Sequence, residues 1–108
     1  MSAYLLIESR DPFEWSEVAR TYELATQLRA AGHEVALFLV QNAVLPVRAG
    51  CRRAGLDRIT GTGIDVLADD FSLRERGIAA TALLNGIRPA SIDFVIERMA
   101  AGWKTIWH

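Results

Sequence analysis

The stretch GHEVALFLV, residues 32–40, decides the fold of this chain of 108 residues. Its run from Glu34 to Val40 is almost wholly apolar, and Ala3 to Ile7 (AYLLI) is a second run of this kind. Continuous apolar runs are typical of strands that are buried on both faces, as in a parallel sheet covered by helices. Between them, Val18, Tyr22, Ala25 and Leu28 recur at helical spacing. This strand–helix–strand unit predicts an α/β fold.

Further strands are predicted at Ile64 to Ala68 and at Lys104 to Trp107, and Ala79 to Leu84 is either a short strand or a helical turn. A helix is expected from Pro46 to about Gly55, because proline suits a first helical turn. The alternation of strands and helices predicts a three-layer α/β/α domain with a mostly parallel sheet of about five strands. We expect one domain over residues 1–108.

Two helices are predicted in the second half of the chain. Asp69 or Asp70 is expected to cap a short helix that ends at Gly77. Ser91 is expected to cap a longer helix. The apolar face of this longer helix is expected to consist of Ile92, Val95, Ile96 and Met99.

Composition excludes several classes of function. A formal net charge of −1 provides no overall attraction to nucleic acid or to an anionic membrane, so we expect neither kind of partner. No apolar run approaches the roughly 20 residues that span a bilayer. The one cysteine, Cys51, cannot form an internal disulfide, which fits a reducing compartment. We therefore expect a cytoplasmic protein.

Polar residues follow the predicted strands at their carboxyl ends. In open α/β sheets ligands bind at this edge, so a small-ligand or metal-binding module is one hypothesis. Its candidate ligand-binding residues are Ser9, Arg10, Asn42, Asp69 and Asp70. Because His33 and His108 do not obviously converge on the two aspartates, no metal site and no cofactor are predicted.

Cys51 is the candidate for a reactive, catalytic residue. Arg48, Arg52 and Arg53 are close to it in sequence, and positive charge favours a reactive thiolate. The alternative is that Cys51 is an inert, small buried residue and that the arginines are a solvated helix face. The same three arginines are also the candidate partner-binding residues.

Several segments together resemble one known family. Ala25 to Val44 is similar to the signature of DsrE-like proteins, which is a helix, Gly-His-Glu-Val, an apolar strand and Gln-Asp/Asn-x-Val. Three others resemble the DsrH (TusB) branch of the DsrE/DsrF/DsrH sulfur-relay family. They are Asp11 to Phe13, Leu67 to Gly77, and Ile92 through Trp107. The resemblance covers nearly the whole chain.

The resemblance implies a DsrE-like fold, homo- or hetero-oligomers with DsrE/DsrF-like subunits, and a sulfurtransferase partner. It also implies cytoplasmic persulfide transfer, in which catalytic members hold a cysteine after the third strand. This chain has Asp69 and Asp70 there, and a carboxylate cannot hold persulfide sulfur. We therefore expect an accessory subunit that is not an enzyme on its own. The alternative is a sulfur carrier that uses Cys51 as its persulfide acceptor.

Overall fold

The computed structural model describes residues 2–108, and its centre is a five-stranded sheet in which every strand pair is parallel. The strand order is β4-β3-β2-β1-β5. The strands are β1 (Ala3–Glu8), β2 (Glu34–Leu39), β3 (Asp65–Asp69), β4 (Ile87–Ala90) and β5 (Lys104–Trp107). Strand β5 therefore pairs with β1 alone and forms one edge of the sheet.

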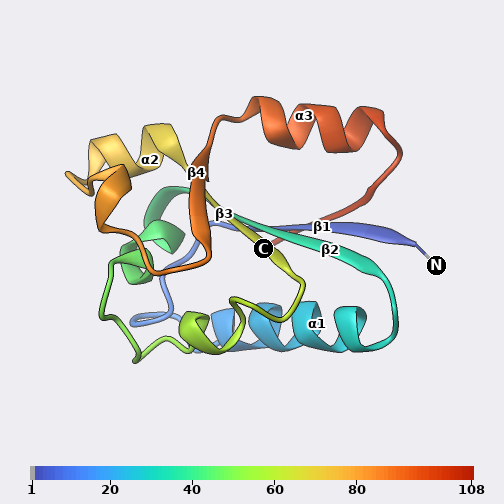
Figure 1. Cartoon of the computed structure of the whole chain (residues 1–108), viewed down its shortest axis with the longest axis horizontal. Coiled ribbons are helices and arrows are strands. Elements are labelled where there is room, and N and C mark those ends of the chain that lie inside the picture. The colour runs from blue at the N-terminus through green and yellow to red at the C-terminus, as the bar shows by residue number, and fades with distance from the viewer. Residues whose placement is uncertain (1) are drawn as a thin grey trace.

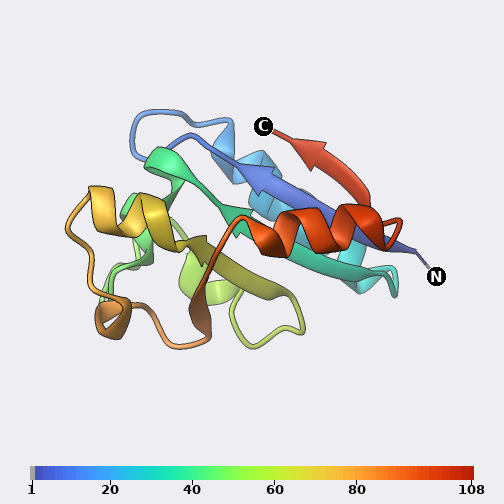
Figure 2. The same cartoon turned by 90° about the horizontal axis from the view of Figure 1, so that it is seen from above.

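Helices cover both faces of this sheet, as Figures 1 and 2 show. Helix α1 (Val18–Ala30) lies on one face, and α3 (Asp93–Ala100) lies on the opposite face. The short helix α2 (Asp70–Glu75) follows β3 directly. Three short 3₁₀ segments complete the chain: η1 (Gln41–Val47), η2 (Leu56–Arg58) and η3 (Ala80–Ala82).

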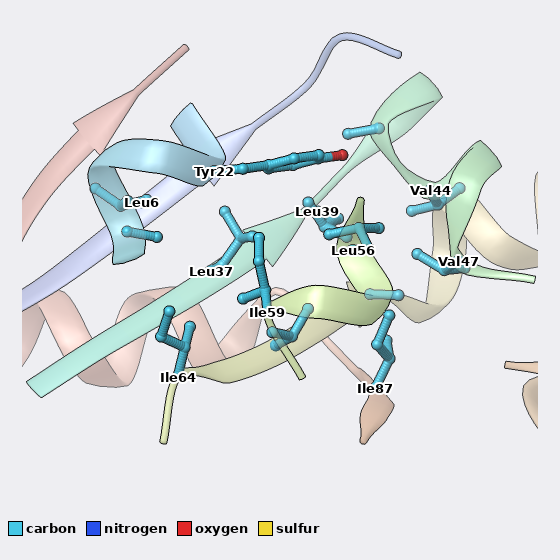
Figure 3. Close-up of a cluster of buried hydrophobic side chains, with 14 of the residues drawn as sticks. Leu6, Tyr22, Leu37, Leu39, Val44, Val47, Leu56, Ile59, Ile64 and Ile87 are labelled. Atoms are coloured by element: carbon cyan, nitrogen blue, oxygen red, sulfur yellow. The ribbon is translucent and has the colours of Figure 1, made fainter. Parts of the chain in front are cut away.

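The larger part of the core lies on the α1 face. Alternate residues of β2, Val35, Leu37 and Leu39, point to this side and are at most 3% exposed. Tyr22 of α1 packs among them (Figure 3). Residues of η1 and η2, which both lie between β2 and β3, also belong to this cluster, so the connections before and after β2 both help to bury this face of the sheet.

The core on the α3 face is smaller. The other residues of β2, Ala36 and Phe38, pack there against Phe94 and Val95 of α3. The rings of Phe38 and Phe94 are stacked, with centroids 6.2 Å apart. The alternation of burial along β2 explains its unbroken apolar run, because both faces of a covered parallel strand need apolar side chains.

The predicted fold class is confirmed: the chain has a three-layer α/β/α architecture with a five-stranded parallel sheet. Four of the predicted strands match β1, β2, β3 and β5 to within one residue. The fifth strand was missed: it is β4, Ile87–Ala90. The segment 79–84 contains the helical turn η3, which is the second of its two predicted alternatives. Strand β4 contains Pro89, and proline is tolerated in a sheet at an edge such as this one.

The predicted helix from Pro46 to Gly55 is wrong. The chain instead forms η1, which includes Pro46, then becomes extended at Arg48. Gly50 and Gly55 have positive φ angles of 87° and 83°, which an α-helix cannot contain. Arg48 forms an antiparallel bridge with Leu83. Cys51 therefore lies in a loop.

The predicted apolar face of α3 is also wrong in part. Of its four residues, Val95 is buried, but Ile92, Ile96 and Met99 are 50–58% exposed. Phe94 is the second residue that α3 buries. The helix therefore carries an apolar stripe that faces away from its own sheet, in addition to the stripe that packs on it.

Candidate functional site

The carboxyl ends of the five parallel strands lie along one edge of the sheet. The pairing sets Glu8 beside Leu39, and Asp69 beside Ala90. His108 follows β5 at the same edge, and its carbonyl accepts the Ser9 N–H at 2.9 Å. The polar side chains at these strand ends form two groups, one around α2 and one around β5.

The first group begins with Asp69, which is 6% exposed and caps α2. Its Oδ2 accepts the Ser72 N–H at 3.0 Å and the Ser72 hydroxyl at 2.6 Å. The Ser72 Oγ in turn accepts the Gln41 N–H at 2.8 Å. Gln41 has a φ of 55°, so this contact holds a strained residue at the end of β2. Asp69, and not Asp70, therefore caps the helix.

Asn42 and Asp70 belong to the same group and also bind neighbours. The Asn42 Oδ1 accepts two hydrogen bonds from the Arg76 guanidinium, at 2.9 and 3.1 Å. Asp70 lies 3.9 Å from Arg74, one helical turn later. The predicted ligand residues of this group are thus engaged in contacts within α2, in the case of Asp69 and Asp70, or between α2 and η1, in the case of Asn42.

Ser9 and Arg10 lie in the second group. The Ser9 hydroxyl donates to the carbonyl of His108 at 3.1 Å, and the Arg10 guanidinium stacks over Trp15, 4.3 Å from its ring centroid. The five predicted ligand residues are therefore divided: three surround α2, and two adjoin β5. They share an edge of the sheet but form two separate sets of contacts.

Two residues of the second group were not predicted, Glu8 and His108. Glu8 is completely buried, and its Oε2 accepts the N–H groups of Ser9 and Arg10 at 3.0 Å each. Its Oε1 lies 2.8 Å from Nδ1 of His108, whose side chain is 34% exposed. The available sequence signal was a glutamate that directly continues the apolar run of β1.

Asp11 and Tyr22 are further buried polar residues near this end of β1. Asp11 accepts the N–H groups of Phe13 and Glu14 at 2.9 Å each, which shapes the turn before α1. The hydroxyl of Tyr22 has no hydrogen-bond partner among residues 2–108. Burial raises the pKa of the Tyr22 phenol, and nearby Glu8 raises it further, with smaller effects of Cys51 and Asp11. Figure 3 shows this hydroxyl pointing away from Leu6, toward the side of Val44.

Cys51 is a free thiol of intermediate exposure. Two of the arginines close to it in sequence have other contacts. Arg52 lies 3.7 Å from Asp57, and Arg53 lies over the ring of Phe13 at 5.5 Å. Arg48 is exposed. Arg52 and Arg53 thus connect the Cys51 loop to η2 and to the turn before α1.

Within residues 2–108, no group of three or more His, Cys, Asp or Glu side chains is arranged to hold a metal ion. No helix of this part of the chain is both long and apolar enough to cross a membrane.

The fold is a three-layer α/β/α fold of the DsrE-like type. No family model matches the chain, and no curated protein has a detectably similar sequence. Among solved structures it is similar to the ychN protein of E. coli, with a TM-score of 0.89 and 18% identity over all of both chains. It is also similar to MTH1491 of Methanobacterium thermoautotrophicum, a protein of unknown function, with a TM-score of 0.82 and 21% identity over 99% of this chain and 98% of that one. At these identities the likeness shows the fold alone.

Proposed function

We propose that this protein is an accessory subunit of a cytoplasmic sulfur-relay complex, and that it carries no sulfur itself while persulfide sulfur passes between cysteines of its partners. The observation that carries the proposal is the turn after β3. Asp69 occupies the region where the sulfur-carrying proteins that the sequence resembles hold a cysteine, and its carboxylate caps α2. This arrangement keeps the turn in place without a thiol.

The surface of the molecule supports the idea of a subunit. Large apolar side chains are exposed on several elements, and such side chains on a small domain favour association. They are Phe13, Trp15, Phe71, Ile92, Ile96, Met99, Ile106 and Trp107. We expect these surfaces to contact DsrE/DsrF-like subunits in a homo- or hetero-oligomer. A sulfurtransferase partner would supply this oligomer with sulfur.

Purification of the tagged protein from its own cells tests this proposal. We expect a native mass well above the 11.9 kDa of one chain, and recovery of a DsrE-like or DsrF-like protein or a sulfurtransferase in stable proportion. An Ile96→Glu variant changes one of these exposed apolar side chains without touching the core, so we expect it to fold and to recover less of the partner. A monomer recovered without any of these partners would contradict the proposal.

A second candidate function is a sulfur carrier that uses Cys51. The observation that favours it is the partial exposure of this free thiol. A persulfide donor should then increase the intact mass of the protein by one sulfur atom. The Cys51→Ser variant should gain no mass, and an equal gain in both proteins would reject this function.

A further inference from the structure

The pair formed by Glu8 and His108 has the geometry of a base with its orienting carboxylate. A carboxylate accepts hydrogen bonds only, and Oε2 of Glu8 is occupied by two backbone N–H groups. Its Oε1 therefore takes the hydrogen on Nδ1 of His108, 2.8 Å away. This tautomer leaves the lone pair on Nε2, which has no hydrogen-bond partner among residues 2–108.

His108 lines a groove between α1 and β5. The groove has a volume of about 320 Å³, and its walls include Thr21 and Leu24 of α1 and Ile106 of β5. Nδ1 is held by a completely buried partner, and the side chain of His108 is nevertheless 34% exposed. The part of the ring away from Glu8 is therefore the part that a molecule in the groove can reach.

We propose, in an inference that rests on the proposed function, that His108 is the proton acceptor for a cysteine thiol that a partner protein presents in this groove. Glu8 is its positioning residue. In this step the S–H bond breaks, its electron pair stays on sulfur as a thiolate, and the proton forms a bond to Nε2. The resulting imidazolium keeps its Nδ1–H on the Glu8 carboxylate, which offsets the new positive charge.

A thiol suits this base better than a hydroxyl group does. Imidazole and thiol groups have ordinary pKa values of about 6.5 and about 8.5, so the proton moves between groups of similar strength. The thiol must come from another chain, because Cys51 is not among the residues that line the groove. The exposed side chains of Ile106 and Trp107 provide an apolar rim, 42% and 66% exposed, for the segment that carries it.

The charges around His108 come from three elements. Glu8 of β1 contacts the ring, Glu17 lies just before α1, and Arg20 of α1 lines the groove. The pKa of the Glu17 carboxyl is lowered by a backbone hydrogen bond and by Ser16, with weaker contributions from Arg10 and His108. Two carboxylates and one guanidinium group thus lie around the groove that His108 lines.

An engineered thiol in the groove tests the proposal without a partner protein. Thiol alkylation by iodoacetamide is measured from about pH 6 to about pH 9 in a Cys51→Ser background that carries Thr21→Cys. We expect the alkylation rate near pH 7 to fall about tenfold when His108→Gln is added. A rise of about one unit in the pKa of the engineered thiol produces a change of this size in its thiolate fraction. Glu8→Gln should shift the pH profile in the same direction.

Two controls separate a base from a general change in structure. Thr26→Cys places a thiol on the exposed surface of the same helix, away from the residues of this groove, and its rate should not respond to His108→Gln. Leu24→Cys is a second thiol inside the groove. Equal pH profiles with and without His108→Gln, for both Thr21→Cys and Leu24→Cys, would overturn the role of His108. The recovery of partners would still decide the proposed function separately.

Discussion

The imidazole of His108 fastens the edge strand β5 to the centre of the sheet through the carboxylate of Glu8, 2.8 Å away. Backbone hydrogen bonds reinforce the contact: Ser9 donates to the carbonyl of His108 at 2.9 Å, and His108 donates to the carbonyl of Ile7 at 2.8 Å. Because β5 has no other strand beside it, these contacts at its carboxyl end also contribute to holding it in the sheet.

The first prediction is that Glu8→Leu destabilises the protein by about 2–4 kcal/mol. The substitution leaves His108 and two N–H groups, those of Ser9 and Arg10, without their buried acceptor. Urea unfolding measures the loss. The control is Glu34→Leu at the exposed start of β2, for which we expect a change within about 0.5 kcal/mol. Equal losses in the two variants would contradict the structural role of Glu8.

The second prediction separates the two aspartates after β3. Asp69→Ala should lower the free energy of unfolding by about 1–2 kcal/mol, because it removes a buried helix cap and leaves Ser72 without its acceptor. Asp70→Ala should cost less than about 0.5 kcal/mol, since its contact with Arg74 is a partly exposed ion pair at 3.9 Å. The same unfolding measurement on both variants checks the order, and a larger loss for Asp70→Ala would show that the cap is wrongly assigned.

The third prediction concerns the buried hydroxyl of Tyr22. Because it has no hydrogen-bond partner among the described residues 2–108, Tyr22→Phe removes a desolvated polar group and keeps the packing of the ring. We expect the free energy of unfolding at neutral pH to stay constant or rise, by up to about 1 kcal/mol. A loss of more than about 1 kcal/mol would mean that the hydroxyl has a partner in solution, such as a bound water.

The fourth prediction is a pH dependence that arises from the same residue. Burial raises the pKa of the folded Tyr22 phenol above its ordinary value of about 10, and Glu8 adds to the rise. The folded state therefore holds this proton more tightly than the unfolded state does. Its contribution to stability is fully present below about pH 10 and is lost as the pH rises from there through the raised, folded value.

Unfolding of the wild type and Tyr22→Phe at several alkaline pH values measures this effect. The advantage of Tyr22→Phe over the wild type should grow above about pH 10 and stay constant below it. A difference that does not change over the alkaline range would show that Tyr22 ionises equally in both states.

The sequence predicted the sheet well because its central strands are covered on both faces. Such strands need apolar residues on both faces, and the buried run from Val35 to Leu39 shows this directly. The cap of α2 was also predicted, down to a choice between Asp69 and Asp70. Strand β4 was missed because it is short, lies at an edge and contains Pro89, so its sequence lacks the apolar run of the others.

The pair of Glu8 and His108 could not be predicted because it depends on the order of the strands. The two residues are 100 positions apart, and they meet because β5 pairs beside β1 at the edge of the sheet. The division of the predicted ligand residues has a similar cause. Asn42 is bound by Arg76, 34 residues later, through the packing of α2 on η1, which the sequence pattern does not show.

The fifth prediction distinguishes the two apolar stripes of α3. Phe94 is 9% exposed and stacks on Phe38, with the Arg98 guanidinium 4.1 Å from its ring centroid, so Phe94→Ala should cost about 3–4 kcal/mol in the isolated chain. Ile96 is 58% exposed, and Ile96→Ala should cost about 0.5 kcal/mol or less there. In the oligomer of the proposed function, Ile96 is expected to be buried by a neighbouring subunit, so Ile96→Ala then affects association rather than folding. Sedimentation of the two variants should therefore show weaker association for Ile96→Ala at unchanged monomer stability. Association that is unaffected by Ile96→Ala would place the subunit contact elsewhere, with β5 and its exposed Trp107 as the next surface to change.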